Sequence, residues 1–423
     1  MNILMMTNTY SPHVGGVARS VSNFTNELRG QGHRVVVVAP EYDGATQNKD
    51  DDIRVPAIQH FSGSDFSMIL PIPGGLHSHL ENFKPDVVHS HHPFLIGSTA
   101  VRISTQYHVP LVYTQHTMHE EYTHYVPTGF SRLKPFVVSL SIGYANMCDQ
   151  VIAPSKSTEE VLRERGVTVP MEVVPTGVES GFENGDGKKI RDQLNIGRDA
   201  FVVGHIGRLA PEKNLEFLAR SIAAFLKDEQ QVHFVVAGYG PSEDELTNFF
   251  ADMNLSRQVH FLGKLENQDL IDAFHAMDVF AFSSKSETQG LVLVEAMTAG
   301  VPVVALDAAG VREVVRDGIN GFLLHNEEQE SFVKALKKIC HASEDSRKNF
   351  CLEARNTTME FTTKKCTAKL LSVYEKVQQE HQSFVNRDES IWQRSMEQMK
   401  VEWELLGNLT TAIGDAIHNG NGH

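Results

Sequence analysis

The sequence predicts an α/β protein with two successive doubly wound units, each a parallel sheet with helices on both faces. Short apolar runs rich in β-branched residues alternate with helical stretches, a pattern typical of fully buried parallel strands. The alternation pauses once and then restarts, which indicates a second unit. The length of 423 residues also exceeds what one ordinary core holds.

The first unit opens with an apolar strand, expected over residues 2–6, and a helix over 17–29. Because the start has no basic segment and no cleavage site, we interpret it as a strand and not as a signal peptide. Continuous apolar runs predict the other buried strands of this unit. They lie at 35–39, 87–89, 111–113, 151–153 and 172–174.

A stretch rich in glycine and charge, GFENGDGKK at 181–189, predicts a linker or a loop next to one. We therefore expect an N-terminal domain over 1–180 and a C-terminal domain over 181–360. Ligands of doubly wound sheets bind at the carboxyl ends of the strands, so two facing units predict one cleft. Strands of the second unit are expected at 201–206, 232–237, 259–262, 279–282 and 303–305.

The last part of the chain lacks strand signals. We expect a crossover helix over 361–380 that returns to the N-terminal domain, and a helical extension over 381–423. Apolar side chains of the extension recur at alternating steps of four and three, as in a helical stripe. This stripe either packs on the chain's own domains or forms a homo-oligomer through 385–423. Its members are Trp392, Met396, Met399, Trp403, Leu406, Thr410, Ile413 and Ile417.

Composition excludes several classes of function. The formal net charge is −15 and the chain has no basic block, which argues against nucleic acid as a partner. No apolar run approaches the roughly 18 residues of a membrane span. The four cysteines form no C-x-x-C pair, so neither a zinc ribbon nor a disulfide framework is expected, and a reducing cytoplasm fits. These cysteines are Cys148, Cys340, Cys351 and Cys366.

The sequence SKSETQGLVLVEAMTAGVPVVA, at 284–305, predicts a helix start that binds an anion. Gly290 leads into a helix over 291–298, which Gly300 ends. The unpaired backbone N–H groups of such a start, at Gly290, Leu291 and Val292, together with the helix dipole, favour a bound diphosphate.

Two glutamates flank this helix start with the spacing E-x7-E. Glu295 lies about one turn inside the helix, where its carboxylate can accept hydrogen bonds from two ribose hydroxyls. Glu287 precedes the helix and can reach the sugar beyond the diphosphate. Two glutamates at this spacing also occur by chance on solvated surfaces, so the wider set of motifs has to support the interpretation.

A second motif, GRLAPEKN, follows the strand expected at 201–206. It begins at Gly207, places Arg208 at the strand end and puts Lys213 in the first helical turn. Two fixed cations there can converge on one diphosphate and stabilise it as a leaving group.

These motifs occur together with VVAGYGP at 235–241 and VHFLGKL at 259–265. In this order they resemble the retaining GT-B glycosyltransferases of family 4 type, which include mannosyl-, glucosyl- and sucrose-forming enzymes. The resemblance runs from residue 1 to about 380. It implies two Rossmann-like domains facing a cleft, a nucleotide sugar as donor, and no metal or other cofactor.

The resemblance also assigns roles to single residues. Arg208 and Lys213 hold the diphosphate, Glu287 contacts the donor sugar and Glu295 contacts the ribose. The sequence departs from the family at one place, because the family often has Phe where Gln289 precedes the glycine. That departure leaves the identity of the sugar open.

The loop around Gly263 and Lys264 lines the base pocket by the same resemblance. In the first unit, the loop 11–17 carries Gly15 and Gly16, which permit close approach of a ligand and, in the family, meet the donor diphosphate. His116 directly follows an expected strand, where the family has a histidine near the donor sugar. The alternative is an ordinary loop histidine with its hydrogen bonds satisfied.

The histidine-rich region does not predict a metal site. The sequence from His116 through His119 to Glu120 matches neither H-E-x-x-H nor H-x-x-E-H, and no third ligand is evident. The acidic run at 50–52 lies in a polar stretch, and we expect it to be a solvated loop.

Three sequence segments are similar to those of a narrower branch of the family, the diacylglycerol glucosyltransferases and plant-type sulfolipid synthases. The segments are HTMHEEYTHYVP, VPTGVE and SETQGLVLVEAM. That similarity implies a lipid acceptor and a cytoplasmic enzyme in peripheral contact with the inner face of the membrane. The segment 132–143 pairs two cations with an apolar face and suits such contact, or it is a core helix. Acidic side chains outnumber basic ones in residues 1–180, which disfavours binding of this unit to an anionic membrane surface.

The function expected from the sequence is retaining transfer of a hexosyl group from a UDP-glucose-like donor, without a covalent enzyme intermediate. Alternatives are transfer to a soluble sugar or polysaccharide, a sugar-nucleotide 2-epimerase, and a non-catalytic sugar-nucleotide-binding protein. The presence of both cations and both glutamates disfavours the last.

Overall fold

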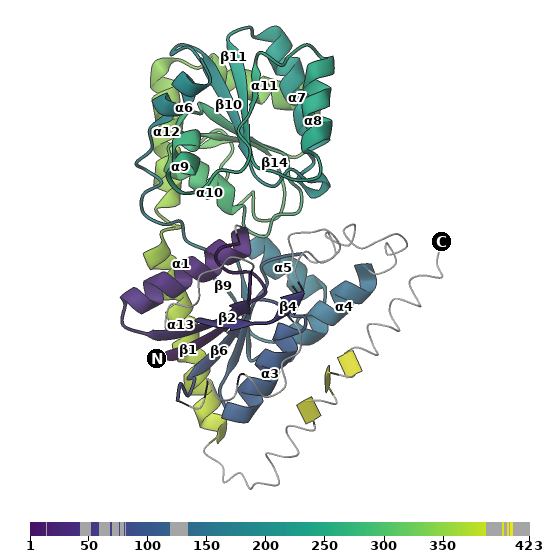
Figure 1. Ribbon diagram of the computed structural model, residues 1–423, viewed down its shortest axis with the longest axis vertical. Helices are drawn as coiled ribbons and strands as arrows, with labels where there is room; N and C mark the ends of the chain where they lie inside the picture. Colours follow the sequence, from purple (N-terminus) through teal and green to yellow (C-terminus); the bar gives the residue numbers. More distant parts are fainter. Residues whose placement is uncertain are drawn as a thin grey trace, which may run out of the picture. The chain divides into compact units, whose positions relative to one another are not determined.

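The computed structural model describes residues 1–13, 15–42, 52–58, 68–69, 76, 80, 82–118, 134–385, 400–401, 404–405 and 407–408. The chain divides into two compact units (Figure 1). One combines Met1–Gly177 with Thr363–His423, and the other is Val178–Thr362.

The first unit contains a seven-stranded sheet in which all paired neighbours are parallel. Its order is β3-β2-β1-β6-β7-β8-β9, so the direction of winding reverses at β1. The carboxyl ends of β1 and β6 therefore border the place where such sheets bind ligands. The strands are β1 (Asn2–Met6), β2 (Arg34–Pro40), β3 (Asp52–Val55), β6 (Val87–Ser90), β7 (Leu111–Thr114), β8 (Gln150–Ala153) and β9 (Met171–Val173), with a separate antiparallel pair β4 (Ala57–Ile58) and β5 (Met68–Ile69).

Helices cover both faces of this sheet, because the side chains of each buried strand alternate between two cores. In β1, Leu4 and Met6 belong to one core, and Ile3 and Met5 to the other. The first core contains side chains of α3 (Ile96–Tyr107), α4 (Lys134–Ala145) and α5 (Lys156–Glu164). The second contains α1 (Gly16–Gly30) and the long α13 (Thr363–Val385), which lie side by side (Figure 1).

The second unit repeats this plan with a six-stranded parallel sheet of order β12-β11-β10-β13-β14-β15. One face packs on α7, α8 and α11, and the other on α9, α10 and α12. The strands are β10 (Phe201–Ile206), β11 (Val232–Ala237), β12 (Val259–Phe261), β13 (Val279–Phe282), β14 (Val303–Leu306) and β15 (Gly321–Leu324). The helices are α6 (Gly187–Gln193), α7 (Leu215–Asp228), α8 (Glu243–Asp252), α9 (Asn267–His275), α10 (Leu291–Thr298), α11 (Gln329–Cys340) and α12 (Glu344–Thr358).

The predicted fold class is confirmed, since both units are parallel sheets with helices on both faces. The predicted solvated loop at 50–52 is wrong at its last residue. Asp52 begins β3, and its side chain is only 7% exposed because it pairs with the Arg29 guanidinium at 3.0 Å. Residues 50 and 51 lie outside the described residues.

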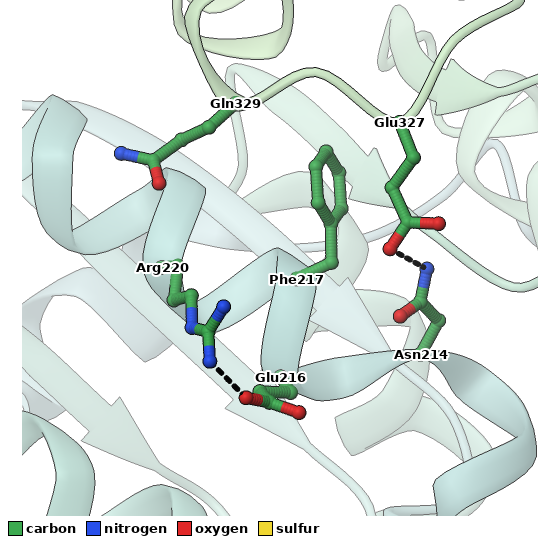
Figure 2. A pocket seen from close by; sticks show the side chains of 6 residues that line it. All are labelled: Asn214, Glu216, Phe217, Arg220, Glu327 and Gln329. Atoms are coloured by element: carbon green, nitrogen blue, oxygen red, sulfur yellow. Dashed lines mark hydrogen bonds and ion pairs between the residues drawn. The ribbon is translucent and has the colours of Figure 1, made fainter.

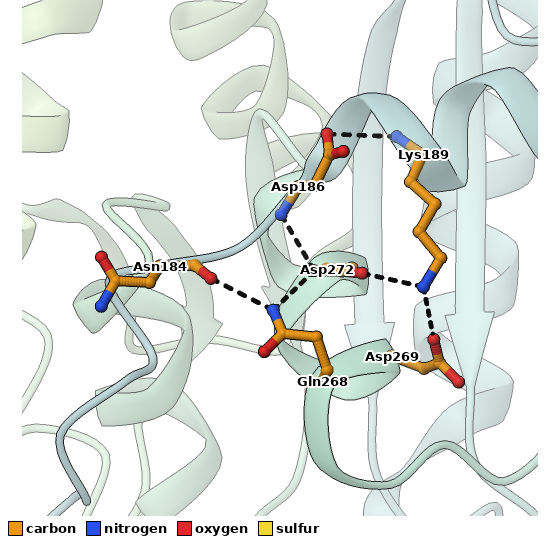
Figure 3. Close-up of polar contacts among 6 residues, drawn as sticks. All are labelled: Asn184, Asp186, Lys189, Gln268, Asp269 and Asp272. Atoms are coloured by element: carbon orange, nitrogen blue, oxygen red, sulfur yellow. Dashed lines mark hydrogen bonds and ion pairs between the residues drawn. The ribbon is translucent and has the colours of Figure 1, made fainter.

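The predicted linker at 181–189 is wrong over its last three residues, since α6 begins at Gly187. A polar network ties the preceding loop to α9 (Figure 3). The Asp186 backbone N–H donates to Asp272 at 2.9 Å, and the Lys189 ammonium donates to Asp269 at 2.7 Å and to Asp272 at 3.1 Å. These bonds make the segment part of the second unit.

Few residues of the C-terminal extension are described, and the whole predicted stripe lies outside them. Val401 packs against the first unit's core of α3, α4 and α5. The Asn408 amide lies 3.1 Å from the Met147 sulfur, and a Cβ added at Gly143 would lie 2.8 Å from the Asn408 side chain. The described part of the extension therefore packs on its own domain. Every helix in the described ranges is too short or too polar to traverse a lipid bilayer.

Candidate active site

The predicted anion-binding helix is α10, which begins at Leu291 after an N-cap at Gly290. Gly290 has φ 72°, a left-handed conformation in which a side chain is strained. Gly310 packs on the same loop, because a Cβ there would lie 2.6 Å from the Gln289 backbone nitrogen. Leu291 and Val292 are half-buried in the first turn. The loop and the helix start are thus fixed by backbone packing, with first-turn N–H groups that have no acceptor within the helix.

Lys213 and Glu287 are brought together. Their side chains form an ion pair at 2.6 Å between Nζ and Oε1, and they are 17% and 14% exposed. Burial by itself raises the pKa of Glu287, but the Lys213 ammonium outweighs burial, and the pKa lies below its usual value. Glu287 therefore stays a carboxylate at neutral pH, beside a fixed positive charge.

The loops that carry this pair are tied to each other. The Ser283 hydroxyl donates to the carbonyl oxygens of Lys213 and Asn214, at 2.9 and 3.0 Å. The Ser286 hydroxyl lies 3.3 Å from the Glu212 carbonyl oxygen. Because β10 and β13 are neighbours in the sheet, the loops at their carboxyl ends meet here.

Gly207 and Arg208 leave β10 at the same edge of the sheet, where Arg208 is half-buried. The Gly207 N–H donates to the Ala237 carbonyl oxygen at 3.0 Å. Gly238 packs on Gly207 so tightly that a Cβ there would lie 1.8 Å from the Gly207 carbonyl oxygen. The Gly238 N–H donates in turn to the Gly263 carbonyl oxygen at 2.8 Å. Successive strand ends therefore bring Gly207, Gly238 and Gly263 together.

Two other predicted donor residues lie near this edge. Lys264 follows Gly263, forms an ion pair with Glu266 at 2.6 Å, and has its ammonium 5.9 Å from the centre of the Tyr239 ring. Glu295 lies inside α10 and is 4% exposed.

A hollow of about 260 Å³ opens at the start of α7 (Figure 2). Arg220 pairs with Glu216 on the helix, and the Asn214 amide donates to Glu327 at 3.2 Å. None of the predicted site residues lines this hollow, although Asn214 directly follows Lys213. Its lining consists of Asn214, Glu216, Phe217, Arg220, Glu327 and Gln329.

In the first unit, Gly15 is the N-cap of α1 and Gly16 is its first residue. A side chain at Gly16 would meet nothing within 4 Å, so the backbone there is open. His116 follows β7 and is half-buried, and its Nε2 lies 2.9 Å from Nδ1 of His91. Sequence reasoning did not single out His91 as a site residue. Its position directly after β6, beside β7 in the sheet, is the signal that could have found it.

One group of atoms of metal-ligand type lies elsewhere in the second unit. Atoms of Glu229, Cys340 and His341 lie within 4.8 Å of one another. The His341 ring nitrogen is 2.8 Å from the Glu229 carboxylate. Burial raises the pKa of the Cys340 thiol to about 11, so the thiol is protonated at neutral pH. The contact between His341 and Glu229 is a surface hydrogen bond beside a protonated thiol.

Comparison with known proteins agrees with this architecture. A family model described as Glycosyl transferases group 1 matches residues 186–357, and one described as Glycosyltransferase Family 4 matches residues 14–181. Alpha-monoglucosyldiacylglycerol synthase of Streptococcus pneumoniae is 30% identical over 341 residues, which cover 77% of this chain and 76% of that protein. The chain belongs to glycosyltransferase family 4.

Other relatives extend this assignment. Sulfoquinovosyl transferase SQD2 of Arabidopsis thaliana is 29% identical over 85% of this chain and 70% of its own length. The crystal structure of Anabaena HepE in complex with UDP shares the fold with a TM-score of 0.71 and 23% identity, and it covers 89% of this chain and 100% of that one. This family 4 member is therefore a glycosyltransferase with the GT-B fold.

Proposed function

We propose that this glycosyltransferase moves a hexosyl group, with retention of configuration, from a UDP-glucose-like donor to a diacylglycerol-type lipid. The observation that supports the nucleotide-sugar donor is the half-buried pair of Lys213 and Glu287. It lies at the carboxyl ends of the strands, where Gly207 and Arg208 also lie. A fixed cation next to a fixed carboxylate suits a substrate in which a diphosphate adjoins a sugar.

Each group has a distinct part in the proposed donor site. Arg208, Lys213 and the start of α10 hold the diphosphate, and Glu287 accepts hydrogen bonds from sugar hydroxyls. Glu295 holds the ribose, and the loop at Gly263 and Lys264 lines the base pocket. His116 approaches the donor sugar and the reaction centre, as the resemblance implies.

The proposed reaction is a substitution at the anomeric carbon. The bond from that carbon to the diphosphate oxygen breaks, and the acceptor hydroxyl attacks from the same face. The hydroxyl proton passes to the departing phosphate, while Arg208, Lys213 and the α10 N–H groups stabilise the negative charge that develops there. No covalent enzyme intermediate and no metal ion are needed, because fixed cations carry the charge.

The lipid acceptor is inferred from relatives and from α4. Two curated relatives are named alpha-monoglucosyldiacylglycerol synthase, from S. pneumoniae and Acholeplasma laidlawii. Residues 132 and 133 of the predicted segment lie outside the described residues. In α4, Lys134 is exposed, and the apolar residues Phe136, Val137 and Leu140 are only half-buried and, among the described residues, belong to neither core of the first unit. An apolar helix face beside a cation suits peripheral contact with a membrane at its cytoplasmic face.

A donor panel combined with two acceptor classes tests this function. Purified protein is incubated with UDP- and GDP-sugars, and with liposomes containing diacylglycerol or with soluble oligosaccharides. We expect UDP release and a glycolipid whose anomeric configuration, read by NMR, matches that of the donor. Product on the oligosaccharide alone would contradict the lipid acceptor. An isomerised free sugar without any glycosylated acceptor would contradict transfer and support the epimerase alternative.

A further inference from the structure

Three histidines occupy the carboxyl ends of β6 and β7 in the first unit. His89 and His91 flank the end of β6, and His116 follows β7. His91 is 2% exposed, and its ring stacks on His116 with centroids 5.2 Å apart and an interplanar angle of 25°. The direct link is the 2.9 Å separation between His91 Nδ1 and His116 Nε2. One of these nitrogens must donate to the other.

The orientation of His91 is fixed from two sides. Its backbone N–H donates to the Met6 carbonyl oxygen at 2.9 Å. Its ring lies 4.1 Å, centroid to centroid, from that of His89. His89 is itself held by the Tyr374 hydroxyl at 2.6 Å and by the Thr114 hydroxyl at 2.7 Å. His91 therefore cannot turn away from His116 without disturbing a buried network.

The position of the proton on His91 follows from its surroundings. Burial lowers the pKa of His91 well below 6.5, so the ring is neutral and carries a single N–H. Its Nε2 is buried and has no hydrogen-bond partner within the described part of the chain. A proton on Nε2 would leave a buried N–H without an acceptor, which is rarer in proteins than an acceptor without a donor. The proton therefore lies on Nδ1, and His91 is the donor to His116.

We propose that His91 is a positioning residue that fixes His116 in the tautomer whose proton is on Nδ1. Because His116 Nε2 accepts from His91, the neutral His116 ring must carry its own hydrogen on the other nitrogen. His116 then presents an N–H donor of fixed direction, the group needed to hold a sugar hydroxyl. The catalytic role of this N–H donor rests on the proposed function, but the tautomer of His116 does not.

Nitrogen NMR on the full chain without substrate tests the tautomer directly. The ¹⁵N shifts of the imidazoles, assigned with single-histidine variants, should show His116 protonated on Nδ1 at pH 7.5. His91→Asn keeps an amide N–H close to the place of Nδ1 and should preserve that tautomer. His91→Leu removes the donor and should move the His116 proton to Nε2 in a substantial fraction. Protonation of His116 on Nε2 in the unaltered protein would overturn the proposal, whether or not the protein is active.

Steady-state kinetics test the positioning role of His91. We expect His91→Leu to lower kcat about 10- to 100-fold with little change in the donor KM, because the reacting groups lose alignment. His91→Asn should recover most of the rate. The matched control is His260→Leu, which breaks a similar pair in the second unit, with His233 Nδ1 3.0 Å from His260 Nε2 and rings 5.2 Å apart. A His91→Leu enzyme as fast as the His260→Leu enzyme would overturn the positioning role.

Discussion

At the scale of single residues, the second unit concentrates charge where water has limited access. Lys213 and Glu287 are each less than one fifth exposed, and they satisfy each other at 2.6 Å. Removing one member leaves the other charge partly desolvated and unpaired, which costs more than a surface pair does. The pair is thus a structural link between two loops, and in the proposed donor site it is the place prepared for the substrate's charges.

Lys213→Ala should lower kcat by about 100-fold, since the proposed mechanism uses this preorganised cation to stabilise the leaving group. The domain should still fold, because the replaced side chain lies at the edge of the sheet and not in a core. The measurement is the initial rate of UDP release with saturating donor. Lys348→Ala is the control, because that lysine is 69% exposed in a surface pair with Glu344. Equal rates for the two variants would contradict the site.

His205 links the second unit's stability to pH. Its Nδ1 donates to the Ala281 carbonyl oxygen at 3.0 Å, and burial lowers its pKa to about 4. The unfolded chain, with a histidine pKa of about 6.5, binds the proton more readily than the folded one. The free energy of unfolding should therefore fall as pH falls from about 6.5 to 4, by up to about 3 kcal/mol from this residue.

The comparison of unaltered protein with His205→Asn isolates this contribution. Asparagine does not titrate. The free energy of unfolding of the His205→Asn variant should therefore change less between pH 7 and pH 4.5 than that of the unaltered protein. Urea unfolding of the second unit at both pH values measures the difference. Parallel pH dependence in the two proteins would show that His205 binds no extra proton on unfolding.

At the scale of elements, the start of α10 depends on one glycine. Gly290→Ala places a side chain at φ 72° and 3.0 Å from the Leu293 side chain, so the first turn must shift. We expect about 1 kcal/mol of lost stability from the left-handed conformation and a donor KM raised about tenfold. Gly318→Ala is a matched control with φ 71° and open space around it. It should lose similar stability and keep the donor KM.

Elements differ in how far the sequence predicts them. The apolar runs at β10, β11 and β13 predict those strands at their observed bounds, because a strand buried on both faces is apolar throughout. The edge strands β3 and β15 were not predicted. β3 carries Asp52 and Arg54 and β15 opens with Gly321, so both depart from the continuous apolar pattern, whereas the other two edge strands, β9 and β12, were predicted. The start of α6 was not predicted because hydrogen bonds to α9, and not a local sequence pattern, hold it.

At the scale of the whole molecule, α13 returns the chain to the unit in which it began. Leu370 and Tyr374 of α13 are fully buried in the core that α1 shares. A chain truncated after Thr362 should therefore lose cooperative unfolding of the first unit, while the second unit still unfolds cooperatively. Truncation after Val385 removes Val401 but leaves α13 in place, so both units should still unfold cooperatively and the number of chains per particle should stay unchanged. Calorimetry and light scattering on both proteins check this, and a halved mass for 1–385 would instead indicate that the extension mediates self-association.

By itself the sequence determined the two parallel sheets and the helix start at Gly290, and it supplied the residue types of the proposed diphosphate site, because these follow from local apolar pattern and short motifs. Only the tertiary structure decided which of these residues meet. Lys213 and Glu287 are 74 positions apart, and His91 and His116 are 25 apart. Their contacts depend on the order of strands in each sheet, which long-range packing sets and no local pattern records.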